Sequence, residues 1–119
     1  MTQETYILTD MTDDDGNYTF GETFVSRSLS SCIDEIVKRA SDFKANHQYE
    51  IGDNDWLDVS RATVEKYIKE DGYIFYVVGE GSGDIRRLFR VIMLTNTVGV
   101  GSFTVQNLSR QAAPSSVAR

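Results

Sequence analysis

Hydrophobic and polar residues alternate near the start of the chain, and this pattern predicts two β-strands. Residues 5–11 form the first strand, and residues 18–25 form the second, with the aromatic residues Tyr18, Phe20 and Phe24 expected on one face. The intervening Asp-Gly and Gly-Asn pairs supply the positive φ angles that tight turns need. The pattern therefore predicts an N-terminal β-hairpin.

Two segments further along show the periodicity of amphipathic helices. In residues 31–46, apolar side chains recur at i, i+3, i+4 and i+7, and Ser31 together with Asp34 resembles an N-terminal capping box. Residues 60–71 carry a shorter apolar stripe, and Gly72 is suited to end that helix. The sequence therefore predicts two helices, each with one apolar side.

The segment between these helices, residues 47–58, is polar and acidic and predicts a loop. Asp58 or Ser60 is suited to cap the second helix, because either side-chain oxygen can accept a hydrogen bond from a backbone N–H of the first turn. The loop also gathers carboxylates that a partner could recognise, namely Glu50, Asp53, Asp55 and Asp58.

The last part of the chain predicts more strands. Residues 73–78 and 87–94 are rich in β-branched and aromatic residues and flank a glycine-rich turn, so they predict a second hairpin. Residues 98–108 predict a further strand, and residues 109–119 have the composition of a tail. Residues 1–108 would then form a single α+β domain, an antiparallel sheet of four or five strands with both helices on one face.

The second hairpin is apolar on both faces, whereas a strand with one side in solvent should alternate apolar and polar residues. Two helices can cover only one of these faces. Either the N-terminal hairpin or residues 98–108 fold over the other face, or a second copy of the chain or another protein covers it. In the latter case, the expected contact residues are Tyr73, Phe75, Leu88, Arg90 and Ile92, with the acidic loop as a second contact surface.

Charge is unevenly distributed along the 119 residues. The formal net charge is −6, but residues 1–58 hold 13 acidic and 4 basic residues, whereas residues 59–119 hold 5 and 8. The asymmetry is typical of proteins with faces of opposite sign, and chance clustering produces it equally well. Two nucleic-acid hypotheses stay open. In one, the acidic half imitates a phosphate backbone; in the other, the arginines and aromatic residues of the second hairpin bind nucleic acid, although the pI near 4.6 argues against this.

Composition and spacing restrict the chemistry that the chain can perform. One Cys and one His exclude zinc sites built from several of either. Cys32 and His47 lie 15 residues apart, about 20 Å along a helix, so they cannot form a catalytic dyad within it. The acidic segments 13–17 and 53–58 lack the glycine and glutamate spacing of an EF-hand. The glycines of residues 79–83 lead into a strand, whereas a phosphate-binding loop leads into a helix. We therefore expect no metal and no cofactor, and an enzyme that uses carboxylates remains the rival class.

The N-terminal residues show no basic region followed by an apolar run, and no stretch is long enough to cross a bilayer. A single unpaired cysteine fits a reducing compartment, so we expect a cytoplasmic protein without membrane contact. No motif is specific enough to name a family. The favoured interpretation is a small non-catalytic protein–protein interaction module, a stoichiometric inhibitor or adaptor of the kind common among phage and mobile-element accessory proteins.

Overall fold

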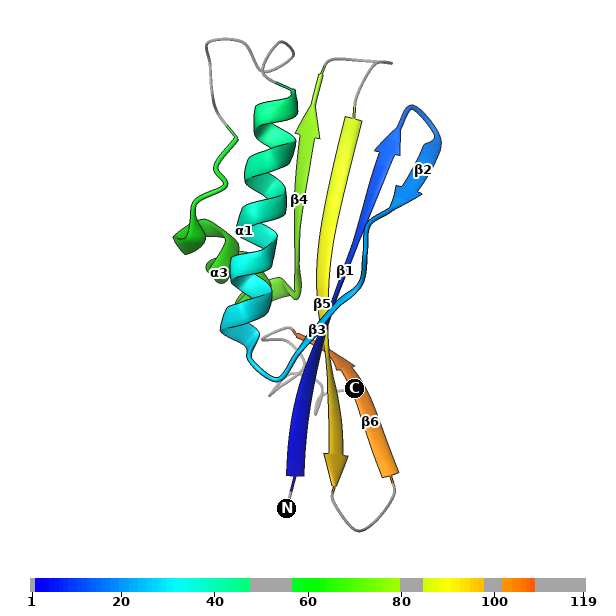
Figure 1. The fold of residues 1–119 in the computed structure, drawn as a ribbon, viewed down its shortest axis with the longest axis vertical. Helices are drawn as coiled ribbons and strands as arrows, with labels where there is room; N and C mark the ends of the chain where they lie inside the picture. Colours follow the sequence, from blue (N-terminus) through cyan, green and yellow to red (C-terminus); the bar gives the residue numbers. More distant parts are fainter. Residues whose placement is uncertain (1, 48–56, 80–84, 98–101, 109–119) are drawn as a thin grey trace, which may run out of the picture.

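Two long antiparallel strands form the centre of a six-stranded sheet (Figure 1). The computed structural model describes residues 2–47, 57–79, 85–97 and 102–108. Strands β1 (Thr2–Asp14) and β5 (Ile85–Thr97) pair with each other along their whole length. Both are longer than the predicted strands 5–11 and 87–94, because each extends for as long as the other supplies hydrogen-bonding partners.

Four shorter strands complete the sheet. On the outer side of β1 lie β2 (Asn17–Phe20) and β3 (Phe24–Ser26), and on the outer side of β5 lie β4 (Tyr73–Val78) and β6 (Ser102–Asn107). All pairings are antiparallel. The structure thus confirms an α+β domain and both predicted hairpins, with six strands where four or five were expected.

The N-terminal hairpin turns at the predicted Asp-Gly pair. Asp15 and Gly16 have φ angles of 53° and 90°, the two successive positive values of a type I′ turn, and the Gly16 N–H donates a hydrogen bond to Asp13 Oδ1 at 2.8 Å. The tight turn brings β2 back alongside β1 with the right-handed twist that a hairpin needs.

The predicted single strand 18–25 is wrong, because the chain divides there into β2 and β3. Phe20 lies opposite Met11, and Phe24 lies opposite Leu8. The segment from Phe20 to Phe24 therefore contains one residue more than the segment of β1 that it faces. Such an extra residue is a β-bulge, and it turns the following side chains to the other face. Phe24 therefore packs against the core instead of sharing a face with Tyr18 and Phe20.

Helix α1 (Leu29–Asn46) begins two residues before the predicted start. Its N-cap is Ser28, whose Oγ accepts a hydrogen bond from the Ser31 N–H at 3.2 Å, so the prediction that Ser31 caps the helix is wrong. Several residues in this segment can cap, and the path of the chain out of β3 decides which one does.

Helix α3 (Arg61–Asp71) has the predicted ends. Ser60 Oγ accepts a hydrogen bond from the Thr63 N–H at 3.4 Å, and Gly72 ends the helix with a φ of 83°. The Gly72 N–H donates to the Ile68 carbonyl at 3.0 Å, which is the C-terminal geometry that favours glycine. The next residue is the first of β4, so this glycine fixes how the helix passes into the sheet.

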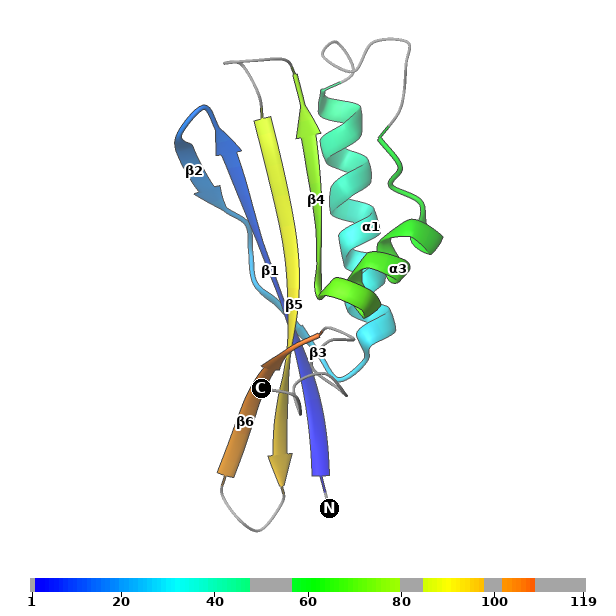
Figure 2. The same ribbon diagram turned by 180° about the vertical axis from the view of Figure 1, so that it is seen from behind.

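The core lies between the helices and one face of the sheet. Helix α1 runs along this face and α3 packs between α1 and β4, while β6 and the ends of β1 and β5 beside it project beyond both helices (Figures 1 and 2). Among the described residues, neither helix is long and apolar enough to cross a membrane. The fully buried side chains of the core include Leu8, Cys32, Ile33, Ile36, Val64, Ile68, Val78, Phe89 and Val91.

As far as the structure describes them, the two candidate covers for the second face of the sheet lie at its edges. The N-terminal hairpin extends the sheet at one edge, and β6, which forms most of the predicted strand 98–108, extends it at the other. Because all six strands lie in the sheet and both helices lie on one side, no element within the described ranges covers the opposite face (Figure 2).

Candidate functional site

The sheet face opposite the helices, called the open face below, carries large apolar side chains from every strand, with the polar pair Thr9 and Arg90 near its centre. The pairing registers and the alternation of side chains place residues from all six strands on it. The large apolar side chains on this face are Ile7, Met11, Tyr18, Phe20, Val25, Tyr73, Phe75, Val77, Leu88, Ile92, Leu94 and Val105.

The five contact residues predicted in the second hairpin all lie together on the open face. Phe75 lies directly opposite Leu88, and Tyr73 lies directly opposite Arg90. Ile92 follows on the same face of β5, opposite Ile7 of β1. Alternation within the two strands was enough to place them, because a β-strand keeps one side-chain period whatever it packs against.

The sequence reasoning missed the half of this surface that the N-terminal strands supply. Met11 and Phe20 lie opposite each other on β1 and β2, and Val25 lies opposite Ile7 on β3. Phe20 is 74% exposed, the highest value among the large apolar side chains that the structure describes. The alternating pattern of the first hairpin was the available signal, but only the pairing of β1 with β5 joins the two hairpins into one surface.

A depression near the middle of the open face places an arginine beside apolar side chains. It has a volume of about 440 Å³, and its lining residues are Thr9, Asp10, Met11, Phe20, Leu88 and Arg90. The Arg90 guanidinium carbon lies 6.0 Å from the centre of the Tyr73 ring, within the range of a cation–π contact. An exposed arginine surrounded by aromatic and aliphatic side chains is a composition typical of interface hot spots.

The predicted second contact surface, the acidic loop, is described by the structure only at Asp58, and Asp58 does not lie on the open face. Glu50, Asp53 and Asp55 lie outside the described residues. Asp58 lies just before α3, where its Oδ2 accepts a hydrogen bond from the Thr63 hydroxyl at 2.6 Å and its Oδ1 accepts one from the Ser60 N–H at 3.0 Å. These hydrogen bonds, led by that of Thr63, lower the pKa of Asp58 to about 2. The Asp58 carboxylate therefore stabilises the N-terminus of α3.

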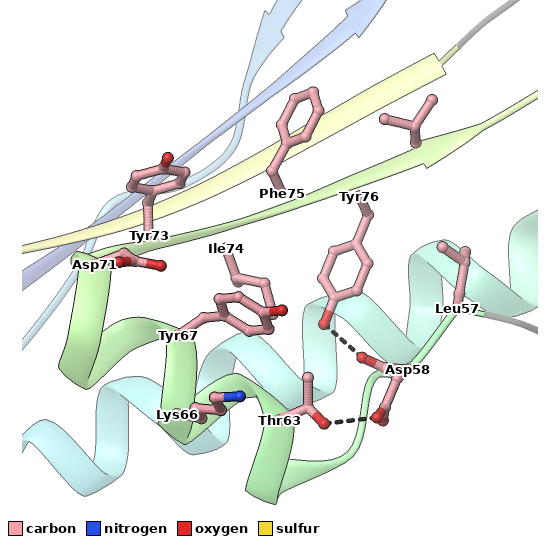
Figure 3. Close-up of a pocket in the computed structure, with 11 residues that line it drawn as sticks. Leu57, Asp58, Thr63, Lys66, Tyr67, Asp71, Tyr73, Ile74, Phe75 and Tyr76 are labelled. Atoms are coloured by element: carbon pink, nitrogen blue, oxygen red, sulfur yellow. Dashed lines mark hydrogen bonds between the residues drawn. The ribbon is translucent and has the colours of Figure 1, made fainter.

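A groove runs beside the free edge of β4, on the side where α3 packs (Figure 3). Its volume is about 580 Å³, and Figure 3 shows Tyr73 and Phe75 pointing away from α3 while Ile74 and Tyr76 point toward it. The Tyr76 hydroxyl donates a hydrogen bond to the Asp58 carbonyl oxygen at 3.0 Å, and burial is the main cause that raises the pKa of this phenol. The lining residues are Leu57, Asp58, Thr63, Lys66, Tyr67, Asp71, Tyr73, Ile74, Phe75, Tyr76 and Val77.

A buried ion cluster ties α1 to the sheet. Asp10 of β1 is 4% exposed, and its Oδ2 lies 2.6 Å from Arg39 Nη1 and 3.3 Å from Arg87 Nη2. Arg39 also donates to Glu35 Oε2 at 2.8 Å and to the Glu22 carbonyl at 2.7 Å. Through these contacts Arg39 links α1 to the strands, so the cluster stabilises the packing of the helix on the sheet.

Cys32 and His47 lie near opposite ends of α1, as the spacing between them predicts. Cys32 is fully buried under Tyr6, with its Sγ 3.9 Å from the Tyr6 carbonyl oxygen, and burial raises the pKa of its thiol. His47 follows the last residue of α1 and packs against Phe43, with ring centres 4.7 Å apart. Among the described residues, no three His, Cys, Asp or Glu side chains are grouped so that they could hold a metal ion.

Comparison of the chain with protein-family models, with curated proteins and with solved structures found no match. The open face and the groove beside it are therefore the features of this chain that indicate a function.

Proposed function

We propose that this chain is a small non-catalytic interaction module that binds another protein through the open face. The single observation that carries the proposal is the set of exposed large apolar side chains that β1 to β6 gather opposite the helices. An uncovered surface of this kind promotes aggregation unless a partner buries it.

The exposed area supports a protein partner in preference to a small ligand. Tyr18, Phe20, Tyr73 and Phe75 are 60%, 74%, 44% and 49% exposed, so at about 200 Å² for each aromatic side chain they alone leave roughly 450 Å² in solvent. Exposed Val25 and Val105, and the half-buried aliphatic side chains between the aromatic ones, bring this surface close to the ~800 Å² that one partner contributes to a standard interface.

The charge of the open face indicates what the partner surface should contain. Arg90 lies beside apolar side chains, and its burial by a partner without a counter-charge would cost about 3 kcal/mol. The partner surface that fits is therefore apolar with a carboxylate placed opposite Arg90. A protein that blocks or joins a larger partner in this way would act as a stoichiometric inhibitor or an adaptor.

Ion pairing of the acidic residues weakens the hypothesis that the acidic half imitates nucleic acid. Asp10 and Glu35 are both bound to Arg39, and Asp34 lies 2.8 Å from Arg61. Part of the negative charge of the first half is thus neutralised by arginines of the same chain, whereas a phosphate mimic must present its charges to the partner.

Site-specific photo-cross-linking in extracts of the source cells tests the proposal. A photoreactive phenylalanine analogue at Leu88 should cross-link a protein, whereas the same analogue at the exposed Lys38 of α1 should not. Phe20→Glu should abolish the Leu88 adduct and change the free energy of unfolding by no more than about 0.5 kcal/mol, because Phe20 is 74% exposed. Equal cross-linking from both positions, or no adduct from Leu88, would refute the proposal.

A further inference from the structure

We propose that two copies of this chain associate through the free edge of β4, which pairs antiparallel with β4 of the second copy. This self-association uses the backbone edge of β4, whose outward residues also contribute side chains to the open face, and goes beyond the proposed binding of another protein.

The hydrogen-bonding pattern of β4 defines which backbone groups point outward. The Val91 N–H donates to the Gly72 carbonyl at 3.0 Å, in the same register that pairs β4 with β5. Hydrogen-bonded and non-hydrogen-bonded pairs alternate in an antiparallel ladder, so every second residue of β4 directs its backbone N–H and C=O away from β5. These outward residues are Tyr73, Phe75 and Val77.

The outward residues of β4 are arranged so that the strand can pair with itself. They are symmetric about Phe75, so a two-fold axis at this residue places Phe75 opposite Phe75 of the second copy and Tyr73 opposite Val77. Each of these pairs then exchanges both of its N–H···O=C hydrogen bonds, and the facing aromatic and β-branched side chains add cross-strand contacts.

The composition of β4 favours a second copy as the occupant of this edge. A two-fold contact brings only the residues near its axis against their own images, so a charge close to the axis would repel itself. All six residues from Tyr73 to Val78 are uncharged, although the chain carries a net charge of −6. A two-fold contact centred on the open face would instead bring Arg90 of one copy near Arg90 of the other.

The surroundings of β4 leave this edge accessible. Natural edge strands are protected by lysine, proline, a bulge or a covering helix or loop. Strand β4 has no lysine, proline or bulge, and α3 packs on the side of the strand from which Ile74 and Tyr76 project (Figure 3). The groove of about 580 Å³ between β4 and α3 leaves room beside the strand, and no other strand within the described ranges pairs with that edge. Pairing would also join the two open faces into one surface, so that a dimer offers two binding sites side by side.

Light scattering of the full-length protein over a wide range of concentrations tests the inference. We expect a dimer that dissociates on dilution. Phe75→Pro removes an N–H that points away from β5, so the β4–β5 ladder survives while the dimer loses the hydrogen bonds at its centre and weakens by about 30-fold or more. Phe75→Val keeps the N–H and should weaken the dimer by no more than about fivefold.

Amide hydrogen exchange of the unmodified protein gives a second measurement that does not depend on how a variant folds. The Phe75 amide should become protected as the concentration rises, whereas the Tyr76 amide, bonded to β5, should be protected at every concentration. A protein that is monomeric throughout, or a dimer that Phe75→Pro leaves intact, overturns the inference. If Leu88 still cross-links a partner in that case, the proposed function stands and only the β4 contact is wrong.

Discussion

The ion pair between Asp10 and Arg39 should contribute far more to stability than an exposed pair of similar geometry. The Asp10 side chain is 1% exposed and that of Arg39 is 16% exposed, and their atoms lie 2.6 Å apart. Removing one partner of a buried pair leaves the other charge uncompensated, which costs about 3–5 kcal/mol. Because Arg39 keeps its bonds to Glu35 and to the Glu22 carbonyl, we expect Asp10→Ala to lower the free energy of unfolding by about 2–4 kcal/mol.

The chain supplies a matched control for this prediction. Arg61 of α3 and Asp34 of α1 also join two separate elements through a 2.8 Å contact, but their side chains are 42% and 64% exposed. Solvent screens such a pair, and holding two long side chains in one geometry costs conformational entropy. We therefore expect that Asp34→Ala lowers stability by an amount too small to resolve in the same assay.

Urea unfolding followed by circular dichroism measures both pairs. With a slope of about 2 kcal/mol per molar urea, the midpoint should fall by roughly 1–2 M for Asp10→Ala. A double-mutant cycle of Asp10→Ala with Arg39→Ala isolates the coupling between these two side chains from the effect of Arg87. The reasoning is refuted if the Asp10–Arg39 coupling is no larger than that of Asp34 with Arg61.

Three further predictions concern single residues. Gly72→Ala should lower stability by at least about 1 kcal/mol more than Gly16→Ala in urea unfolding: both positions have positive φ, but only at Gly72 would the new Cβ overlap a backbone atom, the Leu108 carbonyl oxygen; equal losses would contradict this. Asp58 has a folded pKa of about 2, below the ~3.9 of an unfolded chain, so its contribution is present above about pH 4 and is lost as the pH falls toward 2; the difference in urea midpoint between wild type and Asp58→Asn should shrink over that interval, and a constant difference would count against the hydrogen bonds assigned to it. Cys32 should react with a thiol reagent at neutral pH only after unfolding, since it is fully buried and burial raises the pKa of its thiol; rapid labelling of the native protein would show that α1 opens locally.

Local chemistry was enough to predict several features of this fold. The Asp15-Gly16 turn, the Ser60 cap and the Gly72 stop each depend on the conformations that one or two residues can adopt, so they are readable without any tertiary contact. The strict two-residue period of a strand likewise separated Phe75 from Ile74 before any partner strand was known.

Features that depend on distant segments escaped the sequence reasoning. Asp10 is polar and lies in a strand, and nothing near it in the chain indicates that Arg39 and Arg87 will bury it. The bulge after β2 turned Phe24 into the core, because its position depends on the register against β1 and not on the residues of the strand itself.

The sequence by itself determined the two hairpins, the two helices and the fact that the second hairpin is apolar on both faces, because each follows from local backbone preferences and side-chain periodicity. Only the tertiary structure decided what lies on each side of the sheet. The pairing of β1 with β5 brings together strands from opposite ends of the chain, and this pairing places both N-terminal and C-terminal strands in the sheet plane instead of across its face. Strands β2, β3 and β6 satisfy their backbone hydrogen-bonding groups by pairing with β1 or β5 in the plane of the sheet. They therefore extend the sheet sideways and leave its apolar face open.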